Sequence, residues 1–421
     1  MIFVDLLKNP PLLKAYFKLL FQNHPARLFV GIIVSICLLY VWSSSWFVTT
    51  DGPSHAYNSM VLGQFLFHGD TNPFEKYLHI FWFPFPNWSG HLMLSLLLEV
   101  FALNIAEKIL FSIYVVVFIT GFSVLSTHLR LNLWITVSLI TLFIFPKTFA
   151  TGFFNYQLGF ALLPWAIVAF DPINSHINFI CWSRLFLISM ALYFTHPIPY
   201  FMFLMFCGIF MLLENQRWRK TGLSAAALKL SALIPSFLLM GLFLAETVKE
   251  TVPSSDEAEL LASNFMQLAS LVNYNDVREL PATIFISAFL GILLLTGLYK
   301  ILKPKISNTQ LTAFLCFAVM VLVYFLQPAS FSSAGILSFR IEFIPHIFLI
   351  VFIGSFRWNR IQTISIAFVA VTLNLLLLNI RLPHKRTASI AVEEMMTAAE
   401  HMKQNESAIG LSCFHNGYYD K

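Results

Sequence analysis

The chain has 421 residues, of which 58% are hydrophobic and only 11% are charged. An ordinary soluble domain carries about 25% charged residues, so this composition excludes a soluble enzyme, a nucleic-acid binder and a disordered scaffold. The five cysteines form no C-x-x-C pair, and they predict neither a disulfide framework nor a zinc site. The composition instead predicts an all-α, polytopic transmembrane helical bundle.

The first part of the chain is expected to start in the cytoplasm and cross the membrane early. Residues 1–27 form a basic cytoplasmic segment, and Leu28–Val48 form the first span. A large external loop follows at residues 50–90, with an amphipathic helix over Ser54–His68 and a proline-rich aromatic stretch returning to the membrane at His91. This loop is the longest polar interruption in the first half of the chain.

The remaining apolar runs complete a transmembrane domain predicted over residues 28–380. A second external loop separates two of these runs at residues 246–281, and a short external tail at 381–421 is either a small cap or the start of a larger external domain. Residues expected to form the other apolar runs are His91–Leu103, Ile109–Thr127, Leu131–Phe145, Leu158–Phe170, Phe179–Tyr193, Tyr200–Leu213, Leu223–Ala245, Ile284–Tyr299, Leu311–Leu326, Ile341–Ser355 and Ile361–Leu378.

Basic clusters predict the orientation, because lysine and arginine stay on the cytoplasmic side. Clusters at residues 217–220, 300–305 and 357–360 occupy alternate loops. They fit about 11 spans, with the N-terminus inside and the C-terminus outside, only if one apolar run does not cross. We expect Leu131–Phe145 to be this half-span, with residues 146–157 facing outside; the alternative is the short run His91–Leu103.

The most informative stretch follows the first span, where Thr49-Thr50-Asp51-Gly52-Pro53 stops the helix. Asp51 lies where the apolar helix meets water, and His55 lies one turn into the next predicted helix. A carboxylate in this position can accept a proton from a hydroxyl while it remains ionised. The alternative is a helix-stop turn in which Asp51 only caps the following helix.

This arrangement resembles the type-C glycosyltransferases, which include protein O-mannosyltransferases, oligosaccharyltransferases and the aminoarabinose transferases of lipid A. The resemblance depends on Asp51 with His55 and Tyr57, and on the return segment Phe83-Pro84-Phe85-Pro86-Asn87-Trp88 before His91. The architecture is similar over most of the chain, whereas the specific residues cover only about 40 positions.

The resemblance implies transfer of a sugar from a polyprenyl-phosphate or polyprenyl-diphosphate carrier, on the external face, with inversion at the anomeric carbon. The acidic residue after the first span is then the general base, which corresponds to Asp51. The first loop contains no Asp-Asp, Asp-Glu or D-x-D pair. A metal site is therefore not predicted, although Asp51 and His55 could share a divalent cation.

A leaving phosphate requires positive charge, and arginine is its best bidentate partner. Arg340 opens a span on the external side and is the first candidate, unless it extends to the membrane interface or pairs with Glu342. Lys147 is the second candidate. His196, before Pro197, would contact phosphate or acceptor, or would only cap its turn. Two further residues, Asn155 and Tyr156, would bind sugar or satisfy free backbone groups.

The leading functional prediction is a glycosyltransferase in a bacterial inner membrane, with its site on the periplasmic face. Its expected partners are a polyprenyl-phosphate-linked sugar donor, membrane lipid, and an acceptor that is a glycan, lipid or protein; no nucleic acid is expected. A secondary transporter or a flippase of lipid-linked saccharides is the first alternative. A non-catalytic membrane subunit of an envelope-assembly machine is the second.

Overall fold

The computed structural model describes residues 24–69, 72–81, 83–170, 178–214, 223–247, 251–252, 258–274, 276–302, 306–327, 330–331, 338–399 and 401. These residues are predominantly helical, so the predicted all-α class is confirmed. The one sheet among them is a two-residue antiparallel pairing of β1 (Thr251–Val252) with β2 (Ser330–Phe331). The N-terminal residues 1–23, the basic cluster 217–220 and the tail beyond residue 401 lie outside the described part.

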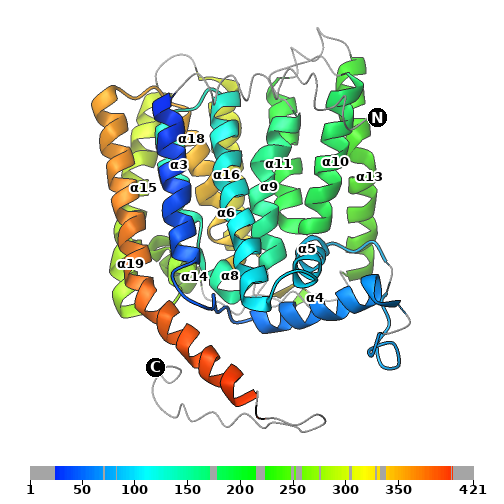
Figure 1. Cartoon of the computed structure of the whole chain (residues 1–421). Coiled ribbons are helices and arrows are strands. Elements are labelled where there is room, and N and C mark those ends of the chain that lie inside the picture. Colours follow the sequence, from blue (N-terminus) through cyan, green and yellow to red (C-terminus); the bar gives the residue numbers. More distant parts are fainter. Residues whose placement is uncertain are drawn as a thin grey trace.

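Long helices pack side by side to form the bundle (Figure 1). Within the described residues, five helical segments are long and apolar enough to span a membrane: Leu103–His128, Ala226–Glu246, Val277–Ile301, Asn308–Leu326 and Arg360–Ala398. The protein is therefore a membrane protein. The bundle helices are α3 (His24–Val41), α6 (Leu103–His128), α7 (Leu133–Ile140) with η2 (Thr141–Phe143), α9 (Phe154–Phe170), α10 (Phe179–Thr195), α11 (Pro197–Leu213), α13 (Leu223–Thr247), α15 (Asp276–Ile301), α16 (Asn308–Leu326), α18 (Ile344–Gly354) and α19 (Arg360–Ala399).

The centre of the bundle is formed by α18, α7, α6 and α9. Every residue of α18 is buried, as are Ile135–Ile140 of α7. Helices that are apolar on all sides belong in the interior of a bundle, and α18 and α7 have this character. The helices around them leave large apolar side chains exposed, among them Phe237, Phe285 and Phe368. Such a surface suits contact with lipid.

Short elements gather at one end of the bundle, which we call the α4 end; it is the lower end in Figure 1. There α4 (Gly52–Phe67) lies crosswise to the bundle helices, as expected for the amphipathic stretch Ser54–His68. Its buried residues are Gly52, Ala56, Ser59, Leu62 and Gly63, which form one face. The other short elements are α5 (Ser89–Leu98), α8 (Lys147–Thr151), α14 (Ala258–Gln267), η3 (Ala269–Leu271) and α17 (Ser338–Ile341).

The run Leu131–Phe145 is not the half-span that we predicted. Asn132 donates to the Thr363 hydroxyl near the start of α19, whereas the carbonyl of Phe145 accepts from Arg381 of the same helix. Thr363 and Arg381 lie 18 positions apart on α19, and Asn132 and Phe145 lie 13 positions apart, about 20 Å at 1.5 Å per residue. The two ends of the run therefore contact opposite parts of α19, and the run does not turn back. The other short run, His91–Leu103, forms most of α5 and the start of α6, and α5 packs on α4.

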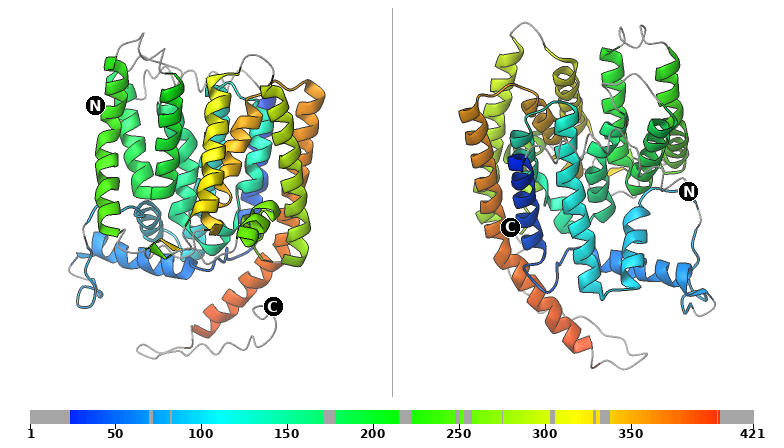
Figure 2. Two further views of the ribbon diagram at one scale, coloured as in Figure 1. Left: turned by 180° about the vertical axis from the view of Figure 1, so that it is seen from behind. Right: turned by 45° about the horizontal axis from the view of Figure 1, so that its top comes forward.

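The predicted boundary between residues 380 and 381 is wrong, because α19 continues without a break to Ala399. Arg381 and Lys385 are each only 1% exposed. The Lys385 ammonium donates to the Tyr40 and Val41 carbonyls, at 2.5 and 3.0 Å, and so caps the C-terminus of α3. Figure 2 shows the C-terminal half of α19 extending past this end of the bundle.

The first span is also shorter than predicted, since α3 ends at Val41 and not at Val48. A connection of turns and irregular chain leads from there to Asp51, and Ser389 of α19 accepts a hydrogen bond from the Trp46 amide at 3.0 Å. Lys385 and Ser389 of α19 therefore hold the connection between α3 and α4. This connection positions the carboxylate that we singled out in the sequence.

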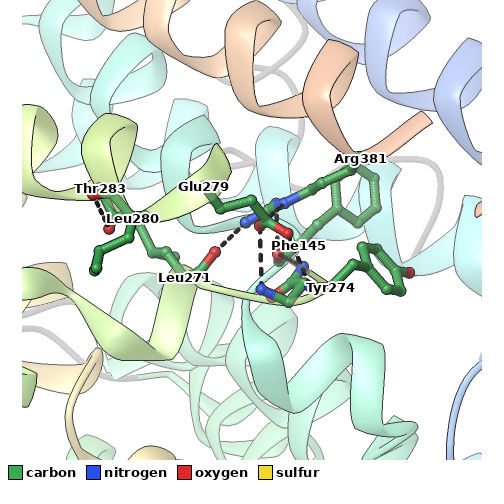
Figure 3. A network of polar contacts seen from close by, with 8 residues as sticks. Phe145, Leu271, Tyr274, Glu279, Leu280, Thr283 and Arg381 are labelled. Atoms are coloured by element: carbon green, nitrogen blue, oxygen red, sulfur yellow. Dashed lines mark hydrogen bonds and ion pairs between the residues drawn. The ribbon is translucent and has the colours of Figure 1, made fainter. Parts of the chain in front are cut away.

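A buried ion pair joins the same region to the bundle (Figure 3). Arg381 donates through Nε to a Glu279 carboxylate oxygen at 2.8 Å and through its terminal nitrogens to the Phe145 and Leu271 carbonyls. Glu279 also accepts from the backbone amides of Asn273 and Tyr274. The network connects α19, α15 and η3 to the residue that precedes Pro146 and α8.

Candidate functional site

The connection between α3 and α4 packs directly on the turn between α8 and α9. The Thr50 amide donates to the Ala150 carbonyl at 3.1 Å, and the Asp51 amide donates to the Thr151 carbonyl at 2.7 Å. Gly152 has a φ of +97°, and a Cβ there would lie 2.9 Å from the Thr49 hydroxyl and 3.0 Å from the Gly52 nitrogen. Only glycine permits both this conformation and this close approach.

Asp51 occupies the N-cap position of α4, but its side chain makes no capping hydrogen bond. Pro53 stands in the first turn of the helix, where its missing N–H costs nothing. The interpretation of Asp51 as only a capping residue is therefore wrong. The carboxylate is partly exposed at the N-terminus of α4.

Arg340 of α17 comes to the same end of the bundle from the last third of the chain. Its guanidinium carbon lies 4.2 Å from the centre of the Phe153 ring, and its buried Nε has no hydrogen-bond partner in the part of the chain that the structure describes. Burial lowers the pKa of Arg340, while Tyr156 and Asp51 raise it. The Asp51 carboxylate therefore lies near enough for its charge to act on the guanidinium.

The alternative pairing of Arg340 with Glu342 is not formed. Glu342 is 1% exposed, and its carboxylate accepts from the Ser270 amide at 2.9 Å. Burial raises the pKa of Glu342 to about 7, whereas the hydrogen bonds from Ser270 and the charge of Lys147 oppose the shift. Lys147, the first residue of α8, is exposed, and it lies near enough to Glu342 for its charge to act on that carboxyl.

Tyr156 and His196 lie beside Arg340, in the interior of the bundle. The Tyr156 hydroxyl donates to the Arg340 carbonyl, and its ring meets the His196 ring edge-on, with centroids 4.9 Å apart. His196 Nδ1 accepts from the Ile198 amide at 3.2 Å, which caps α11. His196 therefore caps its turn and also lies beside the residues that position Arg340.

Two predicted ligands do not take the position expected of them. Both polar atoms of the Asn155 side chain are used by the return segment: Oδ1 accepts from the Gly90 amide at 2.5 Å, and Nδ2 donates to the Asn87 carbonyl at 2.8 Å. Tyr57 is 51% exposed and packs against Phe74, with the centroids of the two rings 6.1 Å apart. We therefore interpret Asn155 as a structural residue. The Tyr57 ring packs on Phe74 and makes no ring contact with the residues around Arg340 in the part of the chain that the structure describes.

His91, which we had not singled out as a site residue, lies at the centre of this end. Its Nε2 is 3.4 Å from Nδ1 of His55, and its Nδ1 is 3.3 Å from the Ser59 hydroxyl. The Phe154 ring covers His55 from α9, at 5.1 Å between centroids. The sequence spacing between positions 55 and 91 carries no signal for this contact, because it depends on how α5 packs on α4.

Glu107 of α6 is a further acid that sequence reasoning missed. It is 7% exposed, and its carboxylate faces the turn at Thr49 and Gly52. Among the described residues, no three His, Cys, Asp or Glu side chains gather as a metal site would require.

No protein-family model, no curated protein and no solved structure matches this chain. The residues described above bring the Asp51 carboxylate, the Arg340 guanidinium and the ring pairs His55–His91 and Tyr156–His196 to one end of a membrane bundle.

Proposed function

We propose that the protein is a membrane glycosyltransferase that moves a sugar from a polyprenyl-phosphate carrier to an acceptor. The acceptor oxygen attacks the anomeric carbon, its proton passes to the Asp51 carboxylate, and the bond from carbon to phosphate oxygen breaks. The electron pair of that bond leaves on the phosphate, and the configuration inverts. Arg340 neutralises the phosphate charge as it develops.

One observation carries this proposal: a carboxylate without a capping bond and a guanidinium with an unused buried N–H lie at the same end of the bundle. A general base must be free to take a proton. A phosphate ligand must have donors that the protein itself leaves unused. Asp51 and Arg340 meet these two requirements, and they are far enough apart to form no salt bridge with each other.

The proposal includes an orientation in the membrane with eleven crossings. These are α3, α6, α7 with η2, α9, α10, α11, α13, α15, α16, α18 and α19, while α4 and α5 lie at the external surface. Arg130, Lys300, Arg357 and Arg360 belong to the end opposite α4, which the positive-inside rule assigns to the cytoplasm. The α4 end then faces the periplasm, where polyprenyl-linked donors and acceptors meet.

The test is a transfer assay with the purified full chain in nanodiscs. Undecaprenyl phosphates carrying radiolabelled pentoses and hexoses serve as donors, and a membrane lipid and glycan extract serves as acceptor. We expect Asp51→Asn to reduce transfer at least about 100-fold, the usual contribution of a general base. Glu75→Gln, which removes an exposed carboxylate from the same loop, is the matched control and should retain full activity.

The same assay separates the alternative functions. With the chain in sealed vesicles, a flippase or transporter would move the donor sugar out of reach of an external enzyme without releasing undecaprenyl phosphate. A scaffold subunit would release no undecaprenyl phosphate. Cells that carry its Asp51→Asn variant would have a normal envelope. Release of undecaprenyl phosphate that requires Asp51 supports the transferase, and transfer that is equal in the Asn variant and the wild type would refute it.

A further inference from the structure

The three-residue chain of Ser59, His91 and His55 fixes the hydrogen positions on both imidazole rings. The Ser59 hydroxyl donates to the His55 carbonyl at 2.7 Å, so its one hydrogen is already used. The 3.3 Å contact of the same hydroxyl with His91 Nδ1 must then have His91 as the donor. His91 therefore carries its hydrogen on Nδ1.

The second contact follows from the first. Burial lowers the pKa of His91 to about 4, and the neighbouring His55 lowers it as well, so the ring is neutral near pH 7. A neutral imidazole has one donor and one acceptor, so the Nε2 of His91 is an acceptor. At 3.4 Å it takes the hydrogen of His55 Nδ1.

His55 is then left with a lone pair on Nε2 that has no hydrogen-bond partner among the described residues. Burial lowers the pKa of His55 and the charge of Asp51 opposes this. The groups that face the ring are Asp51 at the start of α4, His91 from α5 and the apolar Phe154 from α9. Since Asp51 and His55 are one helical turn apart, the free nitrogen lies on the same side of α4 as the carboxylate.

We propose that His55 Nε2, held as an acceptor by His91 and Ser59, binds a second hydroxyl of the substrate beside the one that Asp51 deprotonates. This inference deepens the proposed function. It means that the substrate is a polyol, a sugar or sugar-like headgroup with a free hydroxyl next to the reacting position. In this scheme His91 and Ser59 are positioning residues, because they act through His55.

A site that offers only an acceptor discriminates strongly against a group that cannot donate. An ether or deoxy position would leave the His55 nitrogen unpaired, and sites built to hydrogen-bond a hydroxyl reject analogues that lack it. The Ser–His–His chain therefore specifies chemistry that Asp51 alone does not.

The test of the hydrogen positions does not depend on activity. Diethyl pyrocarbonate acylates imidazole nitrogens that have a free lone pair, and the sites are mapped by peptide mass spectrometry of the full chain in nanodiscs at pH 7. We expect His55 to react at least about tenfold faster than His91, whose two nitrogens are both engaged. Ser59→Ala removes the acceptor that keeps the hydrogen on His91 Nδ1. The ring can then carry its hydrogen on Nε2 and expose a lone pair on Nδ1, so the rate at His91 should increase. The matched control is Ser95→Ala, which removes a buried α5 hydroxyl that donates to the Leu92 carbonyl, and it should not.

The functional part uses His91→Phe and His91→Gln in the transfer assay. The Phe variant lacks the acceptor that orients His55, so its KM should rise about 3- to 10-fold, the effect of one neutral hydrogen bond. The Gln variant keeps an acceptor, so its KM should return most of the way to the wild-type value. Equal acylation of His55 and His91, or a His91→Phe enzyme with unchanged KM, would overturn the inference. Loss of the Asp51 dependence with an intact acylation pattern would instead refute the transferase.

Discussion

Removal of the buried Arg381 side chain should strongly destabilise the protein. Arg381 is 1% exposed, and Arg381→Met would leave the Glu279 carboxylate, with a side-chain exposure of 0%, without its cation. Breaking a buried pair from one side costs about 3–5 kcal/mol. With an unfolding entropy of about 2.1 cal/mol/K per residue, a chain of 421 residues should lose about 3–6 °C in its melting temperature.

The assay is thermal unfolding followed by tryptophan fluorescence in detergent, with two matched variants. Arg386→Met removes an exposed charge from the same helix and should shift the melting temperature by less than about 1 °C. The double variant Arg381→Met with Glu279→Gln removes the unpaired charge and should recover at least half of the loss. A single variant as stable as Arg386→Met, or a double variant less stable than the single one, would refute the account of α19 as part of the bundle.

Four further outcomes follow from the same contacts. Gly152→Ala should cost about 1–3 kcal/mol in thermal unfolding, because alanine resists a φ of +97°; Gly241→Ala, where nothing lies within 4 Å, should cost little. Lys385→Met should cost about 1–3 kcal/mol of stability in thermal unfolding for each α3 carbonyl left without its donor. Arg340→Gln should reduce transfer about 10- to 100-fold in the radiolabel assay, with Arg340→Lys in between. Because the pKa of His55 is lowered, its acceptor form persists below pH 6.5, so KM should stay constant from pH 8 to 6.5 and rise only at lower pH; a rise that starts above pH 7 would contradict this.

The position of Asp51 was predictable from the sequence, because it depends on neighbouring residues only. Gly52 and Pro53 stop one helix and start another, so the position of Asp51 at the start of α4 follows from nearest-neighbour chemistry. The period of apolar residues also indicated the amphipathic character of α4. These features need no knowledge of the rest of the chain.

The parts that depend on distant packing were missed. Arg381 and Lys385 look like the start of a polar tail. Their burial is explained by distant partners: the Glu279 carboxylate and the Phe145 carbonyl for Arg381, and the Tyr40 and Val41 carbonyls for Lys385. In the sequence Asn155 suggests a sugar ligand, but in the structure the backbone of the return segment uses both polar atoms of its side chain. In both cases the partner is far away in sequence, and periodicity carries no information about it.

The same reason explains the wrong half-span. A short apolar run that ends in Phe145-Pro146 suggests a helix that turns back, but its length alone does not show which neighbour it follows. The hydrogen bonds to Thr363 and Arg381 at its two ends show that it runs along α19. Only a tertiary contact could distinguish this run from α5.

The most direct measurement of the central claim asks whether Asp51 and Arg340 share one externally open, lipid-binding site. Asp51→Cys and Arg340→Cys, each made in a chain whose native cysteines are replaced by alanine, are treated with a membrane-impermeant maleimide in sealed vesicles of known orientation. The account predicts labelling of both positions from the external side, and protection of both by undecaprenyl phosphate but not by undecaprenol. Labelling from the cytoplasmic side, or labelling that undecaprenyl phosphate does not slow, would contradict it.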